Sequence, residues 1–312
     1  MPVYRVVTAD LETPVSAFLR LAADEPEAFL FESVEGGEHV GRYTFIGIEP
    51  YKKITARGSA IVVEQKTGPK QDRIRSFEGD IFAELKRSLS GHTPARLPGL
   101  PPFTAGAVGF FAYDVVRQIE RLPSLAKDEL GVPDACLMFF DQVIAFDHVK
   151  KEIHLIVTAD LKRESPAANG RPASASAAYA RAVKRLDRLE KRLGRSLPKP
   201  AKKRGGGRLK LEARTPKATF LKSVRRAKEY IAAGDVFQCV LSQRFDCTPG
   251  VDAFDIYRSL RIVNPSPYMY FLRFGLEAAA PSPTAAVDVS IDEAEASHTT
   301  AEALPAKKNS KK

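Results

Sequence analysis

Short apolar runs joined by tight turns are the feature that most constrains how this chain can fold. Gln142–Phe146 and Glu152–Val157 have strand length and are rich in β-branched and large apolar residues. The segment Asp147–Lys151 between them fits a hairpin turn. Ala60–Glu64 is a third run of this kind, so the first half of the chain is expected to contain several short strands.

Helical periodicity occurs in separate stretches of the same region. Val15–Leu21 places Phe18 and Leu19 on one face, and Asp80–Ser88 repeats apolar residues at helical spacing. Strands joined by hairpins, with helices set aside, favour a mostly antiparallel sheet over a doubly wound parallel one. We therefore predict an α+β fold, with a first domain at residues 1–162.

A helix and a basic linker are predicted for residues 163–214. The predicted helix has an apolar stripe and ends near Gly194. That stripe comprises Tyr179, Val183, Leu186, Leu189 and Leu193. Much of the net charge of +10 lies between Arg181 and Arg226, where aromatic residues occur only at the borders. Base-stacking proteins interleave aromatic with basic residues, so the composition favours a solvated linker and no nucleic-acid partner.

A second unit, at residues 215–275, is predicted to begin another α+β domain. Thr215-Pro216 suits a helix start and Gly234 its end. The apolar face of that helix comprises Phe220, Val224, Ala227 and Ile231. Val236–Phe245 is predicted to be a strand, Asp252 to cap a further helix, and Tyr268–Phe274 to be a very apolar strand.

The composition changes abruptly at Gly275–Leu276. Residues 276–312 contain no aromatic side chain and consist largely of Ala, Ser, Thr, Pro and charged residues. Such a segment has too little apolar surface to offset its ordering entropy, so we predict a disordered tail. The abruptness of the change favours a truncation or a frameshift over a natural tail.

The sequence gives no sign of membrane insertion or secretion. No run approaches the roughly 20 apolar residues of a membrane span, and the N-terminus lacks a secretory pattern. The three cysteines, Cys136, Cys239 and Cys247, have no metal-ligand spacing and lie in apolar runs, so buried reduced thiols are expected. A cytoplasmic location with no membrane partner is predicted.

Four segments, in this order, carry a family resemblance. Leu30–Gly47 reads LFESVEGGEHVGRYTFIG, Gly106–Asp114 reads GAVGFFAYD, Gly234–Phe245 reads GDVFQCVLSQRF, and Asn264–Leu272 reads NPSPYMYFL. Together they closely resemble anthranilate synthase component I over about residues 3–275. Position 31 is Phe where the family commonly has Leu, which keeps the site apolar.

The resemblance implies an activity, a cofactor and partners. Members of that family convert chorismate to anthranilate and pyruvate in tryptophan biosynthesis. They use Mg²⁺ and ammonia that a glutamine amidotransferase, component II, releases from glutamine. L-Tryptophan inhibits them, and the resemblance implies a tryptophan site between the Glu-Ser and the Asn-Pro-Ser-Pro-Tyr-Met segments. Its residues here would be Glu32, Ser33, Asn264, Pro267, Tyr268 and Met269.

The residue chemistry agrees with a site for an amino acid. Glu32 can pair with an ammonium or support the pocket from behind, and Ser33 can bond a polar head group. Tyr268 and Met269 offer apolar surface for an indole ring. Read alone, however, Leu30–Ser33 fits any strand end, and Asn264–Pro267 fits a helix stop followed by a turn. Their joint occurrence within the resemblance is what favours a ligand site.

No catalytic or metal-binding residue of the family can be matched in this chain. In the family these residues follow the point at which the resemblance ends, and the five histidines show no catalytic spacing. We therefore expect the chain to be inactive alone, because the reaction needs rigidly held carboxylates and metal. Two alternatives stay open: a non-catalytic tryptophan-binding fragment, and a related chorismate enzyme such as aminodeoxychorismate synthase component I.

Overall fold

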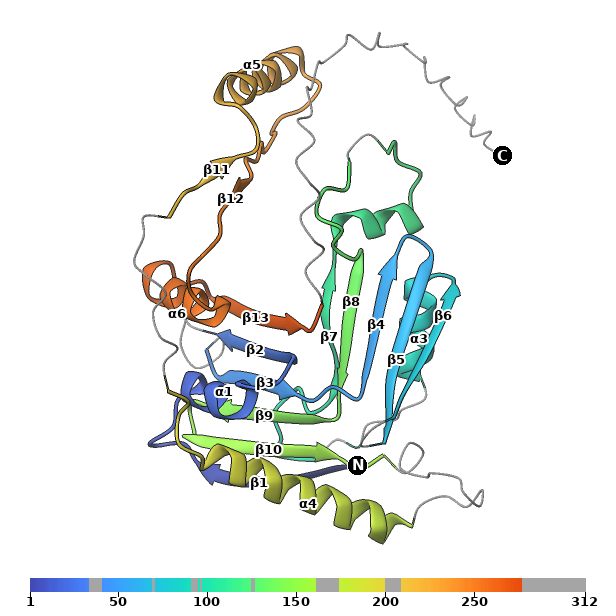
Figure 1. The fold of residues 1–312 in the computed structure, drawn as a ribbon, viewed down its shortest axis with the longest axis vertical. Helices are drawn as coiled ribbons and strands as arrows, with labels where there is room; N and C mark the ends of the chain where they lie inside the picture. Colours follow the sequence, from blue (N-terminus) through green and yellow to red (C-terminus); the bar gives the residue numbers. More distant parts are fainter. Residues whose placement is uncertain are drawn as a thin grey trace, which may run out of the picture. The chain divides into compact units, whose positions relative to one another are not determined.

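Two antiparallel sheets contain most of the strands in the computed structural model (Figure 1). The structure describes residues 1–33, 41–68, 71–90, 95, 97–124, 127–160, 174–199 and 209–276. Within these, sheet A has the spatial order β1 (Pro2–Thr8), β10 (Glu152–Thr158), β9 (Gln142–Asp147), β3 (Tyr43–Ile48), β2 (Glu27–Ser33) and β13 (Tyr268–Phe274). Sheet B has the order β6 (Gln71–Glu78), β5 (Ala60–Gly68), β4 (Lys52–Arg57), β8 (Ala135–Phe140) and β7 (Gly106–Phe111).

Several helices pack against these sheets, and two further short strands form a separate ribbon. The helices are α1 (Pro14–Ala22), α3 (Ile81–Ser90), the 3₁₀ helix η1 (Tyr113–Gln118), α4 (Ala175–Leu193), α5 (Lys217–Ala233) and α6 (Ala253–Val263). The ribbon pairs β11 (Glu212–Ala213) with β12 (Phe245–Asp246). The predicted α+β class with mostly antiparallel sheets is therefore confirmed. None of the described helices has the length and hydropathy that a bilayer crossing requires.

Three apolar clusters hold the sheets and helices together. Beneath α1, α4 and α6, one face of sheet A buries residues such as Phe18, Leu30 and Phe254. Sheet B and α3 share a second cluster. The third joins the opposite face of β2 to β7 and β8 through Phe29 and Phe140, whose ring centroids are 4.9 Å apart. Strand β2 therefore contributes to an apolar core on each of its faces.

The predicted hairpin is present as β9 and β10, with Glu152 paired to Asp147. The helix predicted from the apolar pattern of Val15–Leu21 is present as α1, and it begins at a Thr13 capping box. The Leu186, Leu189 and Leu193 part of the predicted α4 stripe is buried, whereas Tyr179 is 55% exposed.

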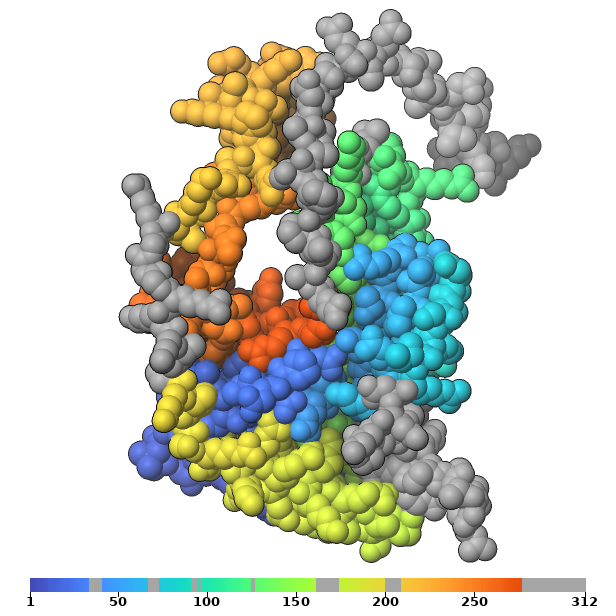
Figure 2. Space-filling model, in the orientation of Figure 1, coloured from blue at the N-terminus to red at the C-terminus, as the bar shows by residue number. Residues whose placement is uncertain are grey.

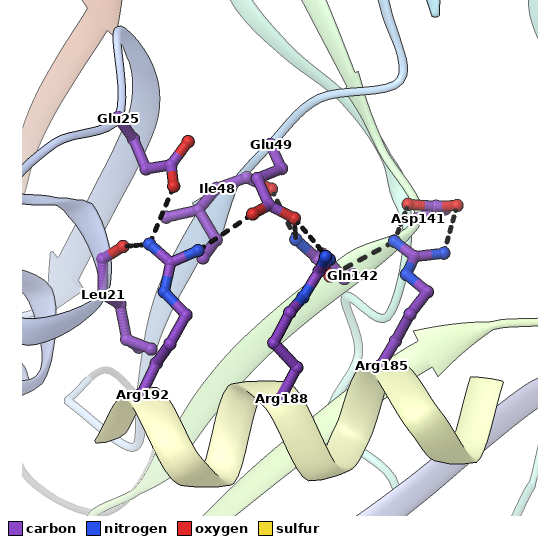
Figure 3. Close-up of polar contacts among 9 residues, drawn as sticks. All are labelled: Leu21, Glu25, Ile48, Glu49, Asp141, Gln142, Arg185, Arg188 and Arg192. Carbon is purple, nitrogen blue, oxygen red and sulfur yellow. Dashed lines mark hydrogen bonds and ion pairs between the residues drawn. The ribbon is translucent and has the colours of Figure 1, made fainter. Parts of the chain in front are cut away.

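A row of arginines fixes α4 on sheet A beside the apolar stripe (Figure 3). Arg185 donates to both oxygens of Asp141, at 2.8 and 2.6 Å. Arg188 and Arg192 both donate to Glu49, at 2.8 and 2.9 Å, and Arg192 also reaches Glu25 at 2.7 Å. These spacings of three and four residues put all three guanidinium groups on one side of the helix.

Three expectations for the chain are wrong or only partly met. Val236–Phe245 is not a strand: only its last residue is paired, and Phe237 is 95% exposed, so the apolar run gains no burial that would favour a ladder. Helix α5 ends at Gly234 as predicted, but none of its residues is buried. Cys136 is buried, and burial raises the pKa of its thiol to about 11, whereas Cys239 and Cys247 are exposed.

Residues 277–312 of the predicted tail, and residues 163–173 and 200–208 of the predicted helix-and-linker segment, lie outside the described residues. Residues Met1–Ser124 and Pro133–Leu276 form one compact unit, which contains all the helices and strands named above. Strand β13 belongs to this unit because it pairs with β2 along its whole length.

Candidate functional site

The two segments singled out in the sequence meet at one edge of sheet A. Strands β13 and β2 are antiparallel, and their register pairs Tyr268 with Ser33 and Met269 with Glu32. In the space-filling view the orange-red residues of β13 lie directly against the blue residues of β2 (Figure 2). Ser33 Oγ also donates to the carbonyl of Pro267 at 3.1 Å. Residues more than 230 positions apart are thus held side by side by backbone and side-chain hydrogen bonds.

Local sequence explains why the chain turns here. Asn264 is the C-cap residue of α6, and its backbone angles (φ −145°, ψ 71°) are no longer helical. Its N–H still donates to the carbonyl of Leu260. Proline at 265 and 267 cannot continue a helix. The chain therefore leaves α6 and enters β13 within a few residues, which places Tyr268 beside the end of β2.

A pocket of about 470 Å³ opens at this edge. Its lining is mostly aromatic, with few polar groups. It is formed by Phe31, Glu32, Ser33, Arg42, Tyr43, Phe45, Tyr268, Met269 and Tyr270. Pockets of roughly 300–1,000 Å³ that combine apolar walls with a few polar groups are typical of small-molecule sites.

Strand alternation divides the lining between the two faces of the sheet. Because neighbouring side chains in a strand point to opposite faces, Ser33 and Tyr268 lie on one face while Glu32 and Met269 lie on the other. Paired residues share a face, so Phe31 and its partners Tyr270 and Phe45 lie with Ser33. The open aromatic side of the pocket is therefore the Ser33 face.

The Glu32 carboxylate is buried against α6 on the opposite face. Its residue is 5% exposed. Tyr257 Oη donates to Oε2 at 2.5 Å, and Arg261 Nη2 donates to Oε1 at 2.9 Å. Burial and the bond to this carboxylate raise the pKa of Tyr257, so the phenol stays protonated and donating. The Glu32 carboxylate is thus directed toward α6 and away from the open aromatic side of the pocket.

Arg42 is the only cationic residue among the described residues that line the pocket. Its guanidinium lies 4.9 Å from the centroid of the Tyr43 ring. Nη2 donates to Asp147 Oδ2 at 2.8 Å, and Nε is 3.2 Å from the same oxygen. The N–H groups of Val149 and Lys150 donate to Asp147 Oδ1.

These contacts keep Asp147 ionised. Burial alone would raise the pKa of this carboxyl, but the hydrogen bonds from Arg42 and from the Lys150 N–H outweigh burial and hold the pKa below its ordinary value. The charged Asp147 in turn fixes the position of Arg42 at the pocket. A rigidly held guanidinium of this kind suits a carboxylate ligand.

Four of the six residues named from the sequence line the pocket: Glu32, Ser33, Tyr268 and Met269. Pro267 is exposed and contributes its carbonyl to Ser33, while Asn264 is the exposed cap residue of α6 and is not in the lining. Sequence reasoning gave no role to Arg42, Tyr43, Phe45 or Tyr270. The first three belong to the GRYTF run of the resembling segment, and Tyr270 follows Met269 by one residue.

Within the part of the chain that the structure describes, no group of three or more His, Cys, Asp or Glu could hold a metal ion. The described residues therefore do not fit the Mg²⁺ that the resemblance implies. His148 accepts or donates a 2.8 Å bond with Thr44, and His154 is buried. His39, His92 and His298 lie outside the described residues.

Comparison with known proteins gives one family and a consistent set of relatives. Residues 26–299 match the family described as chorismate binding enzyme, and the match continues beyond Gly275, where the resemblance read from the sequence ends. Anthranilate synthase component 1 of Acetivibrio thermocellus is 37% identical over 283 residues, covering 88% of this chain and 54% of that protein. The proteins of the same name from Thermus thermophilus and Mycobacterium tuberculosis are 38% and 39% identical, covering 88% and 93% of this chain and 54% of each relative.

A solved structure supports the fold. The crystal structure of anthranilate synthase component I from Streptococcus pneumoniae matches with a TM-score of 0.57 and 24% identity, covering 84% of this chain and 53% of that one. The chain spans about half the length of the curated relatives it matches.

Proposed function

Because this chain belongs to the chorismate binding enzyme family, we propose that it is the part of an anthranilate synthase component I that binds the feedback inhibitor L-tryptophan. The pocket between β2 and β13 is the proposed inhibitor site. The observation that carries the proposal is the pairing of Glu32–Ser33 with Tyr268–Met269 around an open aromatic pocket.

The chemistry of the lining suits an aromatic amino acid. Phe31, Phe45 and Tyr270 present ring surface on one face of the sheet, which favours an indole through burial and edge or stacked contacts. Arg42 can receive the ligand carboxylate while it keeps its bond to Asp147, since a guanidinium has five N–H donors. Ser33 Oγ and the strand-end backbone can bond the ligand's polar head group.

The activity of the whole protein is part of the same proposal. Under this proposal, the complete component I converts chorismate to anthranilate with Mg²⁺, and a glutamine amidotransferase component II supplies the ammonia. Support comes from relatives that carry the name anthranilate synthase component 1. No catalytic step is assigned to the described residues, which hold no cluster fit for the metal.

Thermal unfolding with added amino acids tests the proposed site. L-Tryptophan at millimolar concentration is expected to raise the melting temperature, because a ligand that binds the folded state stabilises it by mass action. With L-phenylalanine or L-alanine at the same concentration, the melting temperature should equal that of the ligand-free chain within experimental error. A chain whose melting temperature L-tryptophan does not change would lack the proposed site.

Two variants make the test specific. Arg42→Gln removes the pocket's cation and is expected to abolish the shift that L-tryptophan causes. Arg75→Gln is the matched control, because Arg75 is a surface residue on β6 that pairs with Glu84 and does not line the pocket. Equal shifts in the two variants would show that tryptophan acts elsewhere.

A further inference from the structure

Glu32 connects the pocket to helix α6 across the sheet. Its backbone lies between Phe31 and Ser33 in β2, both in the pocket lining. Its carboxylate, on the other face, receives the Tyr257 hydroxyl and the Arg261 guanidinium. Tyr257 and Arg261 are four residues apart on α6, so they present one face of that helix to a single carboxylate.

Ser33, the residue after Glu32, makes a second contact between β2 and the segment that follows α6. Ser33 donates to Pro267 in the segment that joins α6 to β13, and β13 then pairs with β2 along its length. The Glu32 side chain therefore binds helix α6, and the Ser33 side chain binds the turn that follows this helix. A shift of β2 at these residues acts on both ends of the segment from α6 to β13.

The contacts of Glu32 are strong enough to transmit such a shift. The side chains of Glu32 and Arg261 are 4% and 30% exposed, and Arg261 Nε lies 2.8 Å from Oε2. Hydrogen bonds to charged groups are roughly twice as strong as neutral ones, and a buried carboxylate that loses its partners is strongly disfavoured. The helix is therefore expected to follow the carboxylate.

We infer that Glu32, Tyr257 and Arg261 form a relay that couples occupancy of the β2–β13 pocket to the position and stability of helix α6. This inference rests on the proposed function, since L-tryptophan is the occupant assumed. The ligand binds the Ser33 face, stabilises β2 against β13, and the relay transmits that change to α6. Glu32 is thus a positioning residue that acts through its two partners on the helix.

Hydrogen–deuterium exchange of the full chain tests the relay, with Tyr257→Phe as the central variant. This change removes the hydroxyl and keeps the ring that packs on Phe254 and Phe271. Without ligand, amides of residues 30–33 in β2 are expected to exchange about tenfold faster than in wild type, the size expected for loss of one bond to a charged group. Arg258→Gln is the control on the same helix, because Arg258 pairs with Asp255.

Added L-tryptophan gives the second arm of the same experiment. In wild type it should slow exchange in β2, β13 and α6, whereas in Tyr257→Phe it should slow exchange in β2 and β13 but not in α6. If Tyr257→Phe and Arg258→Gln show the same exchange in β2 without ligand, the relay is wrong. If tryptophan slows exchange in α6 equally in Tyr257→Phe and wild type, the relay is also wrong. If tryptophan changes nothing in wild type, the proposed function fails, while the first arm still decides whether Tyr257 couples α6 to β2.

Discussion

Helices α4 and α5 have similar amphipathic patterns in the sequence and very different surroundings in the structure. Helix α4 buries five residues against α1 and sheet A. Three of its arginines also donate hydrogen bonds to carboxylates on the side of the helix that faces the sheet. Helix α5 buries none, although Phe220, Val224 and Ile231 repeat at helical spacing. An apolar stripe therefore predicts that a helix forms, but burial depends on whether a complementary surface is present.

Truncation of a stripe residue should separate the two helices most clearly. Leu186→Ala in α4 is expected to lower the free energy of unfolding by about 2–5 kcal/mol, because Leu186 is 2% exposed and its removal leaves a cavity. Ile231→Ala in α5, at a residue that is 43% exposed, should change it by about 0.5 kcal/mol or less. Urea unfolding of both variants measures the contrast, and similar losses would show that α5 is packed as α4 is.

Breaking an ion pair should also destabilise the protein more on α4 than on α5, although the difference in unfolding free energy should be smaller than for the apolar residues. Arg185→Gln removes the ion pair with Asp141, whose side chain is 6% exposed, and should lower the free energy of unfolding by about 2 kcal/mol. Arg226→Gln in α5 breaks a pair whose side chains are both over 60% exposed, so its effect should be about 0.5 kcal/mol or less. A salt titration sharpens the comparison, because only the exposed pair should be screened strongly.

The Arg42–Asp147 pair extends the comparison to pH. The pKa of Asp147 is lower in the folded state than in the unfolded state. The stability that the ionised carboxylate provides is therefore fully present above the unfolded-state pKa, near 4, and is lost as the pH falls through the lower folded-state pKa. Asp147→Asn should therefore be less stable than wild type by about 1 kcal/mol at pH 7, with a difference that narrows below about pH 4. Denaturant unfolding at pH 7, 4 and 3 gives this difference; a gap that stays constant with pH would contradict it.

Local patterns predicted local structure well. The β9–β10 hairpin, helix α1, the Gly194 and Gly234 helix ends and the Asp252 cap all depend on contacts between residues close in sequence. The strand expected at Val236–Phe245 failed because a strand needs a neighbour, which periodicity within one segment does not report.

The candidate site was predictable only in part. The family resemblance indicated that Ser33 and Tyr268 belong together, which no short-range pattern could show. That Glu32 is buried against Tyr257 follows from the register of β2 with β13, because alternation then assigns each side chain to a face. Arg42 was missed because its place in the pocket depends on Asp147, more than 100 residues away.

The absence of tryptophan from the sequence makes one measurement especially direct. Added L-tryptophan is then the only indole in solution, and its emission reports its own environment when it is titrated with the chain. We predict a saturable change in the intensity and wavelength of that emission with the wild-type chain and with Arg75→Gln, and none with Arg42→Gln. Emission that stays that of free tryptophan at all wild-type concentrations, or a change that Arg42→Gln retains in full, would contradict the assignment of the β2–β13 pocket as a tryptophan site.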